Sequence, residues 1–268
     1  MQEFERTFLL AWGSVLSKAK LLIAFASLAL SGLLVVFCSA ISVDASPLVN
    51  LSLKFLPLFA STGIFLGAGV LISKIHYHER KGLKLSLGRL LLGSVDLVIG
   101  TTYLGLPSFL IYLILWTLMG LICFLQQLPL IGPIFQVFFS FAPFLILAVT
   151  LCLAFLSLAL LFWVAPIAAK GAIKRLNLIK EVSSLILKKP LFSIFSFFIG
   201  CFPLLFAAAI LWLAASLTDH SVIYSHDPRL KPLEWLFMML PFAALLSPFL
   251  VFFFQYATIS SETLEPAR

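Results

Sequence analysis

The sequence predicts an all-α polytopic membrane protein with six transmembrane helices, and three observations lead to this fold class. Hydrophobic residues occupy 62% of the 268 positions and charged residues only 11%, and the mean hydropathy is +1.14. Soluble domains carry about 45–50% apolar and about 25% charged residues, so this composition excludes a soluble domain, a disordered chain and a nucleic-acid-binding domain. The other two observations are six apolar stretches of spanning length and an alternation of basic and weakly charged connections between them.

Six stretches have the length of a membrane-spanning helix, which needs about 20 apolar residues. No Asp, Glu, Lys, Arg or His occupies the middle of any of them. This argues against an ion-coupled pump, because ionisable residues within spans usually mark ion pathways. Pro107 is expected to bend or break the third stretch, and Pro143 to interrupt the fourth. The stretches are residues 21–43, 55–73, 97–125, 134–164, 191–217 and 233–257.

Basic residues alternate from one connection to the next. Fifteen of the eighteen Lys and Arg fall in the N-terminal segment, in the connections 74–96 and 165–190, and in the C-terminal tail. The positive-inside rule places this basic side in the cytoplasm. Both chain ends are therefore predicted to be cytoplasmic, and the expected location is the plasma (inner) membrane of a bacterium.

Each basic segment ahead of an odd-numbered span has the three- and four-residue periodicity of an amphipathic helix. In the first segment the apolar positions are Phe4, Phe8, Trp12, Val15 and Ala19. The chain thus divides into three copies of a surface helix followed by a hairpin of two spans, within one transmembrane domain over 1–257 and ahead of a short cytoplasmic tail at 258–268. The copies are 1–73, 74–165 and 166–257, and a threefold repeat is a hypothesis based mainly on hydropathy.

Cations in these segments are the candidates for binding lipid headgroups, because interfacial helices keep their cations near anionic lipid. The predicted partners are therefore membrane lipids of the anionic cytoplasmic leaflet rather than nucleic acid, although the net charge is +7. The candidates are Lys18, Lys20, Arg80, Lys81, Lys84, Arg89, Lys170, Lys174, Arg175, Lys180, Lys188 and Lys189.

Gly63 and Gly67 form a GxxxG pattern inside the second predicted span. Small residues at this spacing let two membrane helices approach closely. The pattern predicts helix packing, either inside the bundle or at the face of a homo-oligomer or a membrane-protein partner.

Four ionisable residues frame the last outer loop: Asp219, His220, His226 and Asp227. They are weak candidates for a metal site outside the membrane, because their spacing matches no established metal motif. His76 and His78 lie two residues apart and do not share a helix face, so chelation by this pair would need an extended segment. No HExxH, GxSxG or Walker loop occurs in the sequence, so no catalytic residue and no cofactor is predicted.

The features that carry a family likeness are Ala11-Trp12 near the start, Lys188-Lys189-Pro190 ahead of the fifth span, and Pro166 after the fourth. On these, the chain resembles uncharacterised six-pass bacterial inner-membrane families, namely the YciC type and the membrane portion associated with glycerophosphodiester phosphodiesterases. The resemblance implies charged amphipathic helices ahead of hydrophobic hairpins. It does not extend to the phosphodiesterase domain, so it implies no catalytic residue.

Three functions from different classes follow from the sequence. The first is a non-enzymatic membrane protein that contacts lipid or acts as an assembly scaffold, which the uncharged spans favour. The second is a transporter or facilitator for an apolar or zwitterionic solute, with sites at the prolines that interrupt spans, Pro107, Pro203 and Pro241. The third is a membrane enzyme that uses the four ionisable residues of the outer loop.

Overall fold

The structure is a computed structural model. It describes residues 2–264 except for 44, 83–87, 89–93, 130–131, 171–181, 183, 185–186 and 222–230. Within this part of the chain the regular structure is helical, and six helical segments are long and apolar enough to cross a membrane. The predicted fold class of an all-α polytopic membrane protein is therefore confirmed.

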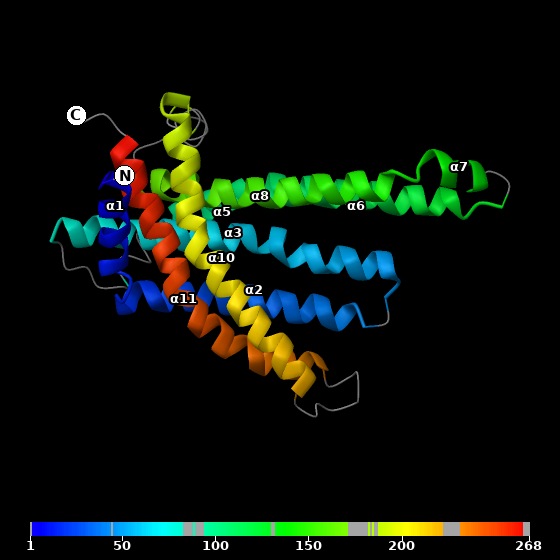
Figure 1. The fold of residues 1–268 in the computed structure, drawn as a ribbon, viewed down its shortest axis with the longest axis horizontal. Helices are drawn as coiled ribbons and strands as arrows, with labels where there is room; N and C mark the ends of the chain where they lie inside the picture. Colours follow the sequence, from blue (N-terminus) through cyan, green and yellow to red (C-terminus); the bar gives the residue numbers. More distant parts are fainter. Residues whose placement is uncertain are drawn as a thin grey trace.

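The helices follow the order expected from the hydropathy pattern (Figure 1). Those of spanning length match the six predicted stretches, with the third span built from two helices joined by a short 3₁₀ turn, η1. The elements are α1 (Gln2–Gly13), α2 (Lys18–Ile41), α3 (Pro47–Arg80), α5 (Val95–Thr102), η1 (Tyr103–Gly105), α6 (Leu106–Gln126), α7 (Gly132–Phe138), α8 (Ala142–Ala169), α10 (Pro190–Ser221) and α11 (Lys231–Leu264).

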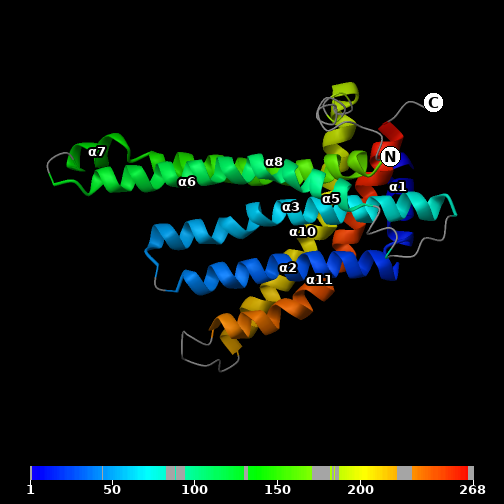
Figure 2. The same ribbon diagram turned by 180° about the vertical axis from the view of Figure 1, so that it is seen from behind.

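The spans form three hairpins, α2–α3, α6–α8 and α10–α11, which meet at one end of the bundle and diverge toward the other (Figures 1 and 2). We call the end that holds α1, the start of α2 and the end of α11 the terminal end. The end at which α2, α6 and α10 end and α3, α8 and α11 begin is the hairpin end. Both ends of the described chain thus lie on one side, as an even number of crossings requires.

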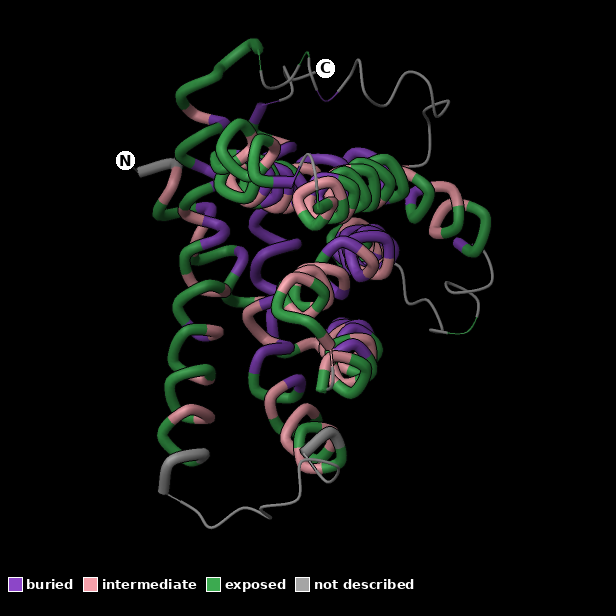
Figure 3. Tube along the Cα trace, turned by 90° about the vertical axis from the view of Figure 1, so that its right-hand side faces the viewer, coloured by how far each residue is buried: buried purple, intermediate pink, exposed green. Residues whose placement is uncertain are grey.

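The last part of α11 is the centre of the terminal end. This helix contacts α1, α2, α3, α8 and α10, and every residue from 250 to 261 is buried. Figure 3 shows this part of α11 as a continuous buried stretch, whereas α10 is exposed along much of its length. Aromatic rings fill the space around α11, with Phe162 of α8 contacting Phe197 of α10 and Phe253 of α11.

The prolines affect the spans differently from one another. The break expected at Pro107 is present as η1, which directly precedes α6. The expected start of the fourth span at residue 134 is wrong, because α7 ends at Phe138 and α8 begins at Ala142. Pro143 does not interrupt the span but lies in the first turn of α8, where its missing N–H has no helical partner to lose. Helices α10 and α11 continue through Pro203 and Pro241.

Helix α1 is present where a surface helix was expected ahead of the first span, and it packs against α11. Its position at a membrane surface stays a prediction. Its predicted apolar stripe packs on the protein in part: Phe8 and Trp12 contact Phe252 and Val15 is buried, but Trp12 is 47% exposed. The other two surface helices were predicted in segments that lie largely outside the described residues. The threefold repeat therefore stays a prediction.

Candidate functional site

The first part of the candidate site joins the start of α2 to the end of α3. The Nζ atom of Lys20 lies 2.5 Å from Oε2 of Glu79, and the hydroxyl of Ser17 donates to Oε1 of the same carboxylate at 3.1 Å. The Lys20 side chain is 0% exposed and that of Glu79 is 42% exposed. A buried ammonium needs a close anion because removing it from water is costly. Glu79 therefore holds a cation that the bundle has enclosed.

The second part joins α11 to the turn after α1 and to α3. The Ser14 hydroxyl donates to Oε1 of Gln255 at 2.9 Å, and Nε2 of Gln255 donates back to the Ser14 carbonyl at 3.0 Å. One turn further along α11, the hydroxyls of Thr258 and Ser73 share a hydrogen bond at 2.9 Å. An ion pair between Arg80 and Glu262 follows at the helix ends. We call this set the polar clamp: Ser14, Ser17, Lys20, Ser73, Glu79, Arg80, Gln255, Thr258 and Glu262.

His76 lies buried beside the polar clamp, within electrostatic range of Lys20, Glu79 and Arg80. Neither of its ring nitrogens has a hydrogen-bond partner among the described residues. His78 differs, because its Nδ1 pairs with the Lys74 carbonyl at 2.8 Å. Within the described chain, no three His, Cys, Asp or Glu side chains come close enough together to hold a metal ion.

The predicted headgroup cations fall into three groups. Lys20 is enclosed and paired, so its side chain is not available at the surface, unlike the others that the structure describes. At the terminal end Lys170 is half-buried. Exposed there are Lys18, Arg80, Lys81, Lys188 and Lys189. The rest lie outside the described residues: Lys84, Arg89, Lys174, Arg175 and Lys180.

Gly63 and Gly67 face the region where the third span is broken. A Cβ atom at Gly63 would lie 2.9 Å from the Thr102 side chain, and one at Gly67 would lie 2.9 Å from the side chain of Val98. Gly105 of η1 in turn approaches the backbone of Gly63. The structure thus places the GxxxG pattern in contact between α3 and the α5–η1 segment of the same chain.

The outer-loop residues are not brought together by anything the structure describes. Asp219 and His220 belong to the last turn of α10, but the structure does not describe their side chains. His226 and Asp227 lie outside the described residues. The weak metal candidate therefore stays a prediction from spacing.

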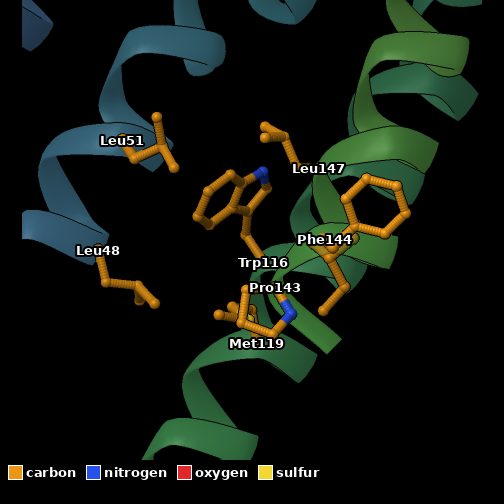
Figure 4. Close-up of a pocket in the computed structure, with 8 residues that line it drawn as sticks. Leu48, Leu51, Trp116, Met119, Pro143, Phe144 and Leu147 are labelled. Carbon is orange, nitrogen blue, oxygen red and sulfur yellow. The ribbon is translucent and has the colours of Figure 1, made fainter. Parts of the chain in front are cut away.

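A cavity of about 200 Å³ lies at the hairpin end, between the start of α3 and the α6–α8 hairpin. Figure 4 shows the Trp116 ring between side chains of α3 and α8. The lining side chains are apolar except for the indole nitrogen: Leu48, Leu51, Trp116, Met119, Pro143, Phe144, Ile146 and Leu147.

Sequence reasoning did not find the polar clamp, because its partners are far apart along the chain. Lys20 and Glu79 are separated by 59 residues and Ser14 and Gln255 by 241. The available signal was a set of polar residues close to span ends, which appears equally when such residues only face water or headgroups. Pairing them required the three-dimensional arrangement of the hairpins.

Comparison of the chain with protein-family models, with curated proteins and with solved structures found no match. The resemblance to the YciC type and to the phosphodiesterase-associated membrane portion stays a prediction from the sequence. Functional arguments therefore rest on the residues of this chain.

Proposed function

We propose that this integral membrane protein is a non-enzymatic scaffold that contacts anionic lipid at its terminal end. The observation that carries the proposal is the gathering of exposed cations there. Lys18 begins α2, Lys81 follows α3, and Lys188 and Lys189 precede α10. Each cation near an anionic surface contributes about 1 kcal/mol of attraction.

Helix α1 supports the proposal because it carries both packed and exposed apolar side chains. Phe8 and Ala11 pack into the protein. Leu9 on the helix, and Leu16 in the turn after it, are among the most exposed apolar side chains of this end. Figure 1 shows α1 lying across the direction of α2. A helix held in this way fits the headgroup boundary, with acyl chains covering its outer apolar residues.

A transporter is the second candidate, and the described structure favours it less. Two of the three proline positions expected to form its site, Pro203 and Pro241, lie within continuous helices. The cavity described above lies at the hairpin end and not at the centre of the bundle. The buried stretch of α11 instead fills the terminal end with side chains.

The experiment measures which lipids remain bound to the purified protein. The protein is reconstituted in equal amounts of phosphatidylglycerol and phosphatidylcholine, re-extracted in mild detergent, and its retained lipids are quantified by mass spectrometry. We expect enrichment of phosphatidylglycerol. Lys81→Glu lowers that enrichment by up to about fivefold, the equivalent of about 1 kcal/mol.

The matched control is Lys54→Glu, which reverses an exposed cation toward the hairpin end. It leaves the enrichment unchanged if the terminal end carries the binding. The combined variant Lys18→Glu, Lys81→Glu, Lys188→Glu and Lys189→Glu is expected to abolish the preference. Equal retention of both lipids by the unaltered protein would refute the proposal.

We further propose that the terminal end faces the cytoplasm of a bacterium. The positive-inside rule supports this, because the basic residues gather at that end. Single cysteines at Gly13 and Lys81, in a variant whose four native cysteines are replaced, should resist a membrane-impermeant thiol reagent in intact cells. Labelling of either without lysis contradicts this orientation.

A further inference from the structure

The connection between α6 and α8 differs from the other two hairpin connections because it carries no charge. No Asp, Glu, Lys, Arg or His occurs from Leu97 to Ala169, a stretch that covers both helices and the turn between them. In the sequence, Asp44 lies between α2 and α3, and Asp227 and Arg229 lie between α10 and α11. Charged residues keep a connection in water, because hydrocarbon is unfavourable for them. The α6–α8 connection has no such residue to hold it outside the bilayer.

Helix α7 and the residues that follow it expose large apolar side chains at the far end of this hairpin. Figures 1 and 2 show α7 at the end of the hairpin, away from the other two hairpins, and its contacts are mainly with α6. Val137 is 75% exposed and Phe138 is 70% exposed. A contiguous apolar patch of this kind marks a contact surface. We call these exposed side chains the apolar tip: Ile134, Val137, Phe138, Phe141, Phe144 and Leu145.

Polar groups around the apolar tip are paired within the hairpin. The amide side chain of Gln136 donates to the carbonyl of Gln126, the last residue of α6, at 3.3 Å. Carbonyls at the end of a helix have no helical partner, so this bond supplies one. The N–H of Gly132 donates to the Leu128 carbonyl at 2.8 Å. Pairing within the protein is what hydrocarbon requires of backbone groups, because it offers no hydrogen bonds of its own.

Prolines remove further backbone donors from the same region. Pro133 is the second residue of α7, and Pro143 is the second residue of α8. An N–H group in the first turn of a helix has no helical partner, and proline has no N–H to leave unpaired there. A protein partner would therefore find few polar groups to bind, whereas acyl chains need none. This favours lipid as the cover of the apolar tip.

The direction of the hairpin allows its far end to stay in the bilayer. The third span runs over 32 residues, Val95–Gln126, more than the roughly 20 that the hydrocarbon needs. A span longer than the hydrocarbon thickness is accommodated by tilting. Figures 1 and 2 show this hairpin inclined to α10 and α11, so no bilayer plane is perpendicular to both hairpins. A slanted crossing of α6 and α8 keeps the apolar tip within the leaflet.

We propose that the apolar tip lies within the leaflet at the hairpin end, with α7 as an interfacial helix that contacts the acyl chains of phospholipids. The connection between α6 and α8 is then embedded in the membrane and is not a turn exposed to water. The contact needs no charge on the lipid, unlike the binding of anionic lipid at the terminal end, and it fixes the depth and the slant of one hairpin. It rests on the protein spanning the membrane.

The test attaches one nitroxide spin label to a variant whose four native cysteines are replaced by alanine. The label is placed at Val137→Cys in the apolar tip or, as the matched control, at Ser46→Cys in the exposed turn ahead of α3. The protein is reconstituted in phosphatidylcholine. Power saturation then measures collisions of the label with oxygen, which concentrates in hydrocarbon, and with a nickel chelate, which stays in water. We expect oxygen to exceed the chelate severalfold at position 137 and the reverse at position 46.

A charge should draw the apolar tip out of the leaflet. Phe138→Asp is expected to reverse the ratio at position 137, because aspartate is among the residues that hydrocarbon tolerates least. The control Phe138→Leu keeps the side chain apolar and should leave the ratio unchanged. If the chelate exceeds oxygen at position 137 without these changes, the tip lies in water and the proposal fails. Low access of both reagents also overturns it, because a protein surface such as a second copy then covers the tip.

A second measurement covers the case in which the cysteine-free variant does not fold. The unaltered protein is irradiated in phosphatidylcholine that carries a diazirine on one acyl chain, digested with chymotrypsin, and mapped by mass spectrometry. We expect lipid adducts on peptides from residues 132–145. Adducts on the spans but none on these peptides contradict the proposal. Because both experiments use zwitterionic lipid, their results do not depend on whether phosphatidylglycerol is enriched at the terminal end.

Discussion

The two ends of the bundle are held together by different means. At the terminal end α11 is in contact with α1, α2, α3, α8 and α10. The polar clamp links α2, α3 and α11 there. At the hairpin end the three hairpins diverge (Figures 1 and 2), and large apolar side chains such as Phe144 and Phe237 are exposed. Lipid tails are as apolar as these side chains, so burying them against another helix gains little. Close packing and polar contacts therefore hold the terminal end, and lipid covers the hairpin end.

Replacing a phenylalanine by alanine at each end should give the largest difference in the free energy of unfolding. Phe162 is 0% exposed and contacts four other aromatic rings of the terminal end, whereas Phe237, near the start of α11 at the hairpin end, is 68% exposed. Phe162→Ala leaves a cavity and should lower the free energy of unfolding by about 3–5 kcal/mol. Phe237→Ala should change it by less than about 0.5 kcal/mol. Reversible unfolding by dodecyl sulfate in mixed micelles measures both, and equal losses would remove the distinction between the ends.

Two glycines offer a comparison of packing without any loss of side-chain volume. A Cβ atom at Gly69 would lie 2.3 Å from the Phe254 ring. A Cβ atom at Gly120 would have no other atom within 4 Å. Gly69→Ala should therefore destabilise the protein by about 1–3 kcal/mol through overpacking. Gly120→Ala should stabilise it by up to about 1 kcal/mol, because alanine favours the helix. Thermal unfolding in detergent tests the opposite signs, and a stabilising Gly69→Ala would show that α11 is not tightly enclosed.

The ion pair between Lys20 and Glu79 tests whether the stability of the protein depends on an anion beside the buried ammonium. Glu79→Gln leaves the enclosed Lys20 ammonium without an anion. We expect a loss of about 1–2 kcal/mol, below the roughly 3–5 kcal/mol of a fully buried pair because the carboxylate is 42% exposed. Adding Lys20→Met should restore most of this stability. If the double variant is no more stable than Glu79→Gln alone, Lys20 is not enclosed as described.

The smallest expected effect concerns a hydroxyl bond between helices. Thr258→Val removes the hydrogen bond to Ser73 that links α11 to α3. Interhelical hydrogen bonds in membranes contribute about 0.6 kcal/mol on average, so a loss of this size is expected. The control is Thr117→Val on α6, where the hydroxyl bonds the Leu113 carbonyl of its own helix. A double-mutant cycle with Ser73→Ala isolates the pair, and zero coupling contradicts the bond.

The sequence by itself determined the number of spans, their order and the end of the bundle at which the cations gather. Runs of apolar residues and alternating charge are local properties, and the bilayer imposes their consequence on each segment separately. The GxxxG pattern at Gly63 and Gly67 likewise indicated close helix packing before the neighbouring helix was known.

Only the tertiary structure decided which helix lies at the centre and which polar residues meet. Helix α11 is no more apolar than α10 along much of its length, yet its last turns are enclosed and those of α10 are not. Lys20 is the enclosed partner of Glu79 instead of a surface cation, and Ser14 pairs with Gln255 from the far end of the chain. These outcomes depend on the relative depth and crossing of helices distant in sequence, and a one-dimensional pattern of hydropathy carries no information about either.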